Sequence, residues 1–167
     1  RQLFENSPIG IWEEDYSGAK RVIDRLKSDG VSDFRAYFTD YPEVLREAVE
    51  AIELLDVNGA AMAIYQVPAH EEFMRHADQY MGVGSPPQSF YIEELSSLAE
   101  GKPRFSMEYE VNDIHGSKVS VRTISNIADG FSETWSHVIS TEEDITERKR
   151  AEETLRETEG RFREIFE

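Results

Sequence analysis

The stretch Asp144-Ile145-Thr146-Glu147-Arg148-Lys149-Arg150-Ala151-Glu152 lies where one hydrophobic pattern ends and another begins. Before it, apolar residues alternate with polar ones, which is the period of a β-strand. After it the apolar positions are spaced by four and three residues, as in the seam of a two-stranded coiled coil: Ala151, Leu155, Thr158, Phe162 and Ile165. A solvated terminal helix held by Glu-to-Arg pairs is the alternative. The stretch therefore predicts a strand that leads directly into a long helix.

Three predicted strands precede this junction and form an antiparallel meander. In the first, Phe105, Met107, Tyr109 and Val111 alternate with polar residues, as a strand with one buried face requires. A turn over 113–116 leads to a second strand over 119–127, and Asp129-Gly130 supplies the next turn. The third strand is expected to run from Trp135 to Ile145.

The N-terminal half mixes strands and helices. We expect a short strand over 9–16 and another at 54–57, where continuing helix is the alternative. Two helices lie between them, one ending at Gly30 and one beginning at Pro42.

Three shorter helices are expected before the meander. Asn58 is a good N-cap for a helix over 59–65, and Pro68 opens a second helix. After a loop over 82–87, a third helix around Tyr91 ends at Gly101.

The bulk composition favours one packed domain with appendages. The chain has 167 residues, of which 39% are hydrophobic, and its formal net charge is −16. Such a surface repels nucleic acid and anionic membranes. No stretch is apolar enough to span a membrane, the first residues do not form a signal peptide, and a cytoplasmic location fits best. The absence of cysteine excludes disulfides, thiolate metal sites, a cysteinyl flavin adduct and a thioester-linked chromophore, and leaves non-covalent flavin open.

Three of these stretches resemble PAS domains. Residues 55–65 are similar to the second strand and following helix of that family, and 108–122 to its central hairpin. Residues 144–152 match the Asp-Ile-Thr motif at the exit of PAS/PAC sensor modules. The resemblance implies an α+β fold, in which helices flank an antiparallel five-stranded sheet and a C-terminal signalling helix follows.

The resemblance also divides the chain. Residues 1–8 would form an N-terminal helical cap, 9–146 the PAS domain and 147–167 a signalling helix that leads into a following module. About 35 residues, placed at 17–51, stand where an ordinary PAS domain has a short turn, which looks like a subgroup found upstream of diguanylate cyclases and histidine kinases.

This resemblance implies a non-catalytic sensory input domain of a bacterial signal-transduction protein, such as a two-component system. The signal would pass through Asp144, Ile145 and Thr146 to a coiled coil and an output domain, either a diguanylate cyclase or a histidine kinase. A homodimer through the terminal helices is the expected assembly. The alternative is a ligand-free dimerisation or interaction module, and an enzyme would need Glu14, His137 and Arg122 together in one pocket.

Aromatic residues with polar atoms are the candidate ligand contacts, because such atoms need partners when buried. We expect Trp12, Tyr65, Tyr109 and Trp135 to enclose a small-molecule site, with Arg122 or His137 as a polar contact. The cofactor is unknown, and haem ligation by a histidine is disfavoured. The four histidines lack metal-ligand spacing, and Gly82-Val83-Gly84 lacks the features of a phosphate loop.

Two acidic clusters, 13–15 and 142–144, are interpreted as solvated charge. The exception is Asp144, which by resemblance should pair with a base or a backbone amide at the strand exit.

Overall fold

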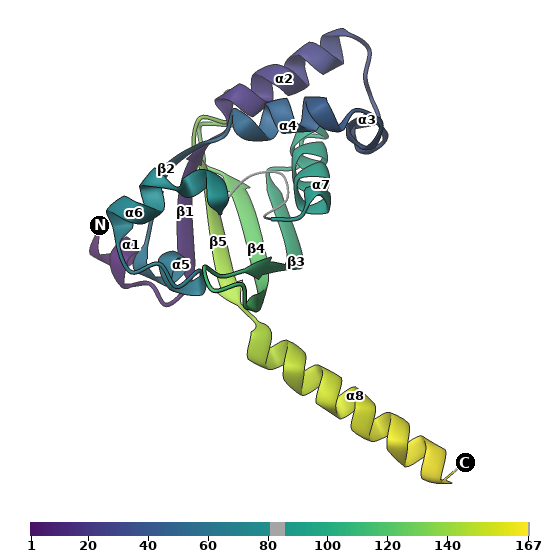
Figure 1. Cartoon of the computed structure of the whole chain (residues 1–167). Helices are drawn as coiled ribbons and strands as arrows, with labels where there is room; N and C mark the ends of the chain where they lie inside the picture. Colours follow the sequence, from purple (N-terminus) through teal and green to yellow (C-terminus); the bar gives the residue numbers. More distant parts are fainter. Residues whose placement is uncertain (81–85, 167) are drawn as a thin grey trace.

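A computed structural model of the protein describes residues 1–80 and 86–166. Within them, five strands form one antiparallel sheet in the order β2-β1-β5-β4-β3 (Figure 1). The strands are β1 (Gly10–Asp15), β2 (Glu53–Val57), β3 (Arg104–Asn112), β4 (Lys118–Ile127) and β5 (Val138–Asp144). The expected meander is therefore present, and β5 lies at the centre of the sheet, between β1 and β4.

The helices lie between the strands and at both ends of the chain. They are α1 (Gln2–Asn6), α2 (Ser17–Ser28), α3 (Phe34–Asp40), α4 (Pro42–Glu50), α5 (Gly59–Ile64), α6 (His70–Arg75), the 3-10 turn η1 (Ala77–Gln79), α7 (Gln88–Ala99) and α8 (Thr146–Phe166). Most of the loop expected over 82–87, including Gly82-Val83-Gly84, lies outside the described residues.

One face of the sheet carries the core. Alternate residues of β1 and β5 are buried, and those between them are half-buried or exposed. β4 repeats the pattern, with Val119, Val121, Thr123 and Ser125 buried. Since successive side chains of a strand point to opposite faces, register alone decides which residues face inward.

Three helices fill the expected insertion between β1 and β2. The apolar stripes of α2 and α4 pack into one core with α7 (Figure 1). The start of α2 lies close to the end of α4 at Gly18. A Cβ added to Gly18 would lie only 2.7 Å from Ala51 Cβ, so a larger residue would not fit there. Helix α3 was not expected separately, although Asp33 caps it by accepting a hydrogen bond from Ala36 N–H.

The third strand of the meander is shorter than predicted. Trp135 is not in β5, which begins at Val138. Its φ of 57° belongs to a turn, in which its N–H donates to the Phe131 carbonyl at 2.7 Å. Its own carbonyl accepts from Tyr16 N–H at 2.8 Å, so the turn holds the start of α2.

Asn58 joins three elements beside the inner face of the sheet. Its carboxamide oxygen caps α5 through Ala61 N–H and accepts from Ile11 N–H of β1 at 2.8 Å. Its NH2 group donates to the carbonyls of Phe4 and Ile9. A Cβ on Gly10 would lie 2.9 Å from Ala61 Cα, so only glycine lets α5 pack this closely on β1.

The chain leaves the sheet through a hydrogen-bonded junction. Ile145 N–H donates to the Ser120 carbonyl at 2.8 Å, and Thr146 Oγ1 accepts from Ser120 N–H at 3.0 Å. Asp144 accepts from Thr146 N–H at 2.9 Å, which is the backbone-amide partner expected for it. Helix α8 then projects away from the domain, and none of its described residues is buried (Figure 1).

Candidate ligand-binding site

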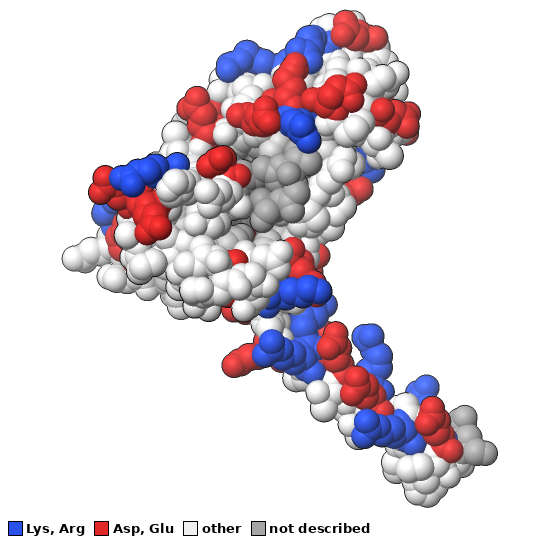
Figure 2. Space-filling model, in the orientation of Figure 1, with Lys and Arg blue, Asp and Glu red and all other residues white. Residues whose placement is uncertain are grey.

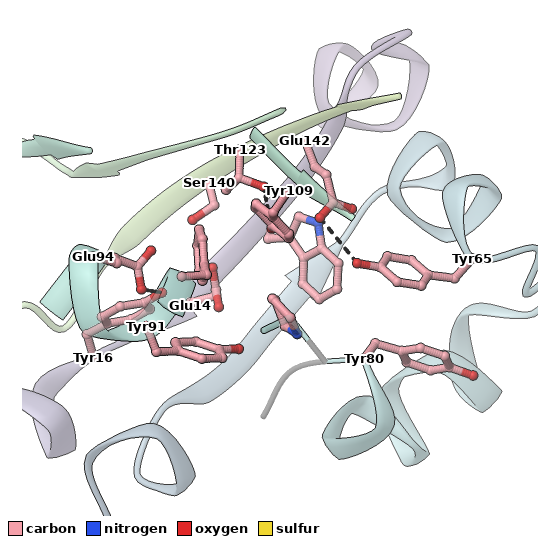
Figure 3. Close-up of a pocket in the computed structure, with 13 residues that line it drawn as sticks. Glu14, Tyr16, Tyr65, Tyr80, Tyr91, Glu94, Tyr109, Thr123, Ser140 and Glu142 are labelled. Carbon is pink, nitrogen blue, oxygen red and sulfur yellow. Dashed lines mark hydrogen bonds between the residues drawn. The ribbon is translucent and has the colours of Figure 1, made fainter. Parts of the chain in front are cut away.

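A small cavity lies between the inner face of the sheet and α7, with the segment around Tyr80 along one side (Figure 3). Its volume is about 30 Å³. One water needs roughly 10–15 Å³ on this measure, so the cavity has room for about two. It is lined by Trp12, Glu14, Tyr16, Tyr65, Tyr80, Pro86, Phe90, Tyr91, Glu94, Tyr109, Thr123, Ser140 and Glu142.

The register of the sheet brings polar side chains to the floor of this cavity. Trp12 of β1 pairs with Ser140 of β5, and Ser140 pairs in turn with Ser125 of β4. Two residues further along β5, Glu142 pairs with Thr123 of β4. A band of carboxyl and hydroxyl groups therefore crosses the inner face at positions where most sheets carry aliphatic side chains.

Glu94 of α7 is fully buried, and both of its carboxylate oxygens have partners. Tyr16 donates to Oε1 at 2.8 Å (Figure 3), and Ser125 donates to Oε2 at 2.6 Å. Ser140 continues this network by donating to Ser125 at 3.2 Å. Glu94 thus ties α7 to β4 and to the end of β1.

Glu142 is only partly satisfied. Tyr65 donates to its Oε2 at 3.2 Å, whereas Oε1 has no hydrogen-bond partner among the described residues. Trp12 Nε1, which also lines the cavity, lacks a partner as well. The two side chains are only 3% and 5% exposed, so these polar atoms are withdrawn from bulk solvent.

Burial raises the pKa of all three glutamates. The pKa of Glu14 rises to about 8, because burial disfavours the charged form and because the carboxyl groups of Glu94 and Glu142 repel its charge. Burial also raises the pKa of Glu94 and of Glu142 to about 7, although the hydrogen bonds from Ser125 and Tyr65 oppose the rise. Near neutral pH these groups hold protons that an exposed glutamate would have released.

Aromatic rings form the walls of the cavity. The centroids of Trp12 and Tyr65 are 6.0 Å apart, and those of Tyr65 and Tyr80 are 5.3 Å apart. On the other side, the rings of Phe90 and Tyr109 are 4.7 Å apart. The site therefore offers hydrogen-bonding groups on its floor and aromatic rings around them.

The structure places three of the six predicted ligand contacts at this cavity and three elsewhere. Trp12, Tyr65 and Tyr109 line it. Trp135 is buried against the core that the sheet shares with α2, α4 and α7, and Lys20 lies 5.9 Å from the centre of its ring.

Arg122 and His137 also lie away from the cavity. Arg122 pairs with Glu143 at 3.1 Å, and the two side chains are half-exposed on the outer face of the sheet. His137 Nε2 lies 3.9 Å from Glu13. Glu14, Arg122 and His137 therefore do not form the pocket that an enzyme would need.

Interpreting the acidic clusters as solvated charge was wrong for Glu14 and Glu142. Both are buried, at 6% and 3% exposure. The signal was available for Glu14, because it lies two residues after Trp12 on one strand and must share its face. Glu94 was missed because α7 is buried on most sides, so no polar stripe marks its outer face.

Other chemical features are few in the described part of the chain. None of its residues form a group of three or more His, Cys, Asp or Glu that could hold a metal ion. No described helix is long and apolar enough to cross a membrane.

Comparisons with known proteins give structural matches only. No family model and no curated protein matches the sequence. A PAS domain from Colwellia psychrerythraea is 14% identical over 87% of this chain and 93% of its own, with a TM-score of 0.51. A sensory box histidine kinase/response regulator from Burkholderia thailandensis is 14% identical over 97% of this chain and 95% of its own, with a TM-score of 0.54.

A third match is an RNA-binding light-oxygen-voltage receptor, 13% identical over 95% of this chain and 36% of its own, with a TM-score of 0.60. At such identities these matches establish the fold. The chain has the PAS fold, an α+β arrangement with helices around an antiparallel five-stranded sheet and a C-terminal helix.

Proposed function

We propose that this chain is a sensory input module, in which a small ligand at the inner cavity changes how α8 leaves the sheet. The observation that carries the proposal is the course of β5. Ser140 and Glu142 of this strand line the cavity, and Asp144, only two residues beyond Glu142, begins the junction with α8. A shift of β5 would therefore move both the cavity wall and the start of α8.

The contacts at the junction support its proposed role as a relay. Asp144, Ile145 and Thr146 bond to one another or to Ser120, so the start of α8 follows the backbone of β4 and β5. Glu108 of β3 adds ion pairs with Arg148 and, at 2.8 Å, with Lys149. To drive such a switch from 1:99 to 99:1, a ligand must prefer one state by about 5.5 kcal/mol.

The exposed face of α8 supports pairing with a second copy. Leu155, Phe162 and Ile165 are 60–75% exposed, and Figure 2 shows acidic and basic residues interspersed along the helix. A helix with so narrow an apolar stripe gains most of its stability from a partner. We propose a cytoplasmic homodimer through its terminal helices, in which α8 leads to a kinase or diguanylate cyclase domain and this chain is not catalytic.

The relay is tested by Asp144→Ala in a full-length protein that contains this chain. Loss of the bond to Thr146 N–H should uncouple output from signal and leave the fold intact, as judged by circular dichroism. Glu147→Ala is the matched control, since it removes a carboxylate from the first turn of α8 without touching the bond to Thr146. If Asp144→Ala is regulated like the wild type, the proposed relay is wrong.

A ligand-free dimerisation module is the second candidate, favoured by the small cavity and the exposed seam of α8. In that case native mass spectrometry would find a dimer with no additional mass, and no ligand would alter α8.

A further inference from the structure

The cavity holds several acidic groups and no basic one among its described lining residues. Three glutamates line it, and the described lining residues include no Lys, Arg or His. A buried carboxylate is costly unless a cation or several donors compensate it, and otherwise it takes up a proton. Donors satisfy both oxygens of Glu94, and a hydrogen bond from Ser140 opposes the rise that burial causes in the pKa of Glu14. Glu142, in contrast, is satisfied at one oxygen only.

One carboxylate oxygen is left available to a ligand. Glu142 Oε2 accepts from Tyr65, and Oε1 is buried without a hydrogen bond of normal geometry, although Trp12 and Tyr109 lie near enough for hydrogen bonding to oppose the rise that burial causes in the pKa of Glu142. Trp12 Nε1 is a neutral donor beside the Glu142 carboxyl and adds no positive charge to the cavity.

The aromatic walls add a second attraction for positive charge. The faces of Trp and Tyr rings attract organic cations, more strongly when water is excluded. The ring centroids of Trp12 and Tyr65 are 6.0 Å apart and those of Tyr65 and Tyr80 are 5.3 Å apart, and Tyr65 also donates to Glu142 (Figure 3).

The size and spread of the acidic groups restrict the cation. The carboxylates do not converge as ligands of one metal ion, since no described group of three does so. A volume of about 30 Å³ admits only a few heavy atoms. A small ion with several N–H donors fits both limits.

We propose that the cavity binds a small organic cation with several N–H donors, a guanidinium or primary ammonium group, held by Glu14 and Glu142 within aromatic walls. This inference rests on the proposed sensory function and names the chemical class of the signal.

Binding of this cation should release protons. The titratable groups facing the cavity are the three glutamates and the tyrosines Tyr16, Tyr65, Tyr80, Tyr91 and Tyr109. Near neutral pH only the glutamates exchange protons, because their pKa values lie at about 7 to 8. A cation that displaces one proton should bind about tenfold more tightly for each pH unit gained below pH 7.

Guanidinium and urea are the matched probes, because they share size, planarity and N–H donors but differ in charge. The 167-residue protein is titrated with each at non-denaturing millimolar concentrations, with NaCl matching the ionic strength. Calorimetry in two buffers of different ionisation enthalpy measures proton release. We expect guanidinium to bind with proton release and to raise Tm, and urea and NaCl to do neither.

Glu142→Gln should weaken guanidinium binding at least tenfold. Glu143→Gln is its matched control, since Glu143 is the next residue on β5 but faces outward and pairs with Arg122. If Glu142→Gln does not fold, the comparison of guanidinium with urea on the wild type still decides the matter.

The proposal is wrong if urea binds as tightly as guanidinium, or if NaCl raises Tm by as much. It is also wrong if neither guanidinium nor methylammonium, the probe for a primary ammonium group, binds. A separate measurement tests the sensory function. The protein lacks cysteine, so a single Leu155→Cys reports the spacing of paired α8 helices through disulfide formation. Guanidinium binding without a change in that rate would keep the cation site and reject the sensory function.

Discussion

Glutamate has opposite pKa shifts on the two faces of the sheet. On the inner face, burial raises the pKa of Glu14 to about 8 and that of Glu142 to about 7. On the outer face, hydrogen bonds from Lys149 and Arg148 lower the pKa of Glu108 to about 2. The difference shows that position in the register, not residue type, decides whether a glutamate in this fold stores a proton or anchors a helix.

The largest expected effect is a loss of stability as pH rises. The inner glutamates hold protons in the folded state that the unfolded chain releases above about pH 4.5, so raising pH favours unfolding. Their contribution is complete below that pH and is lost as pH rises through 7 to 8. Each titrating group should cost up to about 1.4 kcal/mol per pH unit in the free energy of unfolding.

Urea denaturation at pH 5, 6, 7 and 8 measures this slope. Glu14→Gln should flatten it, because an amide does not titrate. Glu108→Gln should leave the slope above pH 5 unchanged, because the pKa of Glu108 is lowered. A stability that rises steadily from pH 5 to 8 would contradict the burial of protonated glutamates.

A smaller effect on stability is expected when a serine on the inner face of the sheet, rather than one on the outer face, is replaced by alanine. Ser125 donates to Glu94 Oε2 at 2.6 Å, so Ser125→Ala leaves a buried acceptor without its donor. This should cost about 1–3 kcal/mol in the free energy of unfolding. Ser106, on the exposed face of β3, is the control, and Ser106→Ala should change stability by less than about 0.5 kcal/mol. Equal costs would mean that the inner network adds no stability.

The contrast between the faces was only partly predictable from sequence. In β3 and β4, polar and apolar residues alternate, so the meander follows from the pattern, and the same alternation argued against Arg122 as a ligand contact. In β5 the pattern fails after Ile139, because Ser140, Thr141, Glu142 and Glu143 are all polar. Only pairing with β1 and β4 decides that Ser140 and Glu142 face inward.

Local signals predicted some elements and misplaced one residue. The capping role of Asn58 follows from short-range chemistry and the exit contact of Asp144 was implied by the PAS resemblance, and the structure has both contacts. Trp135 was assigned to the start of the third strand, after the turn that Asp129-Gly130 supplies. Its positive φ depends on the hydrogen bonds from Trp135 N–H to Phe131 and from Tyr16 N–H to Trp135, and the second partner is remote in sequence.

The smallest expected effect on stability concerns the outer face. Glu108 is exposed, so Glu108→Gln should change the free energy of unfolding little, because surface ion pairs contribute little. Its expected effect is local: without the pairs to Arg148 and Lys149, the first turn of α8 should open more often, and its amides should exchange faster with deuterium. Glu110→Gln on the same face of β3 is the control and should leave that exchange unchanged. If both variants exchange alike at low salt, where ion pairs are strongest, then the hydrogen bonds of Ile145 N–H and Thr146 Oγ1 with Ser120 hold the helix to the sheet without the ion pairs.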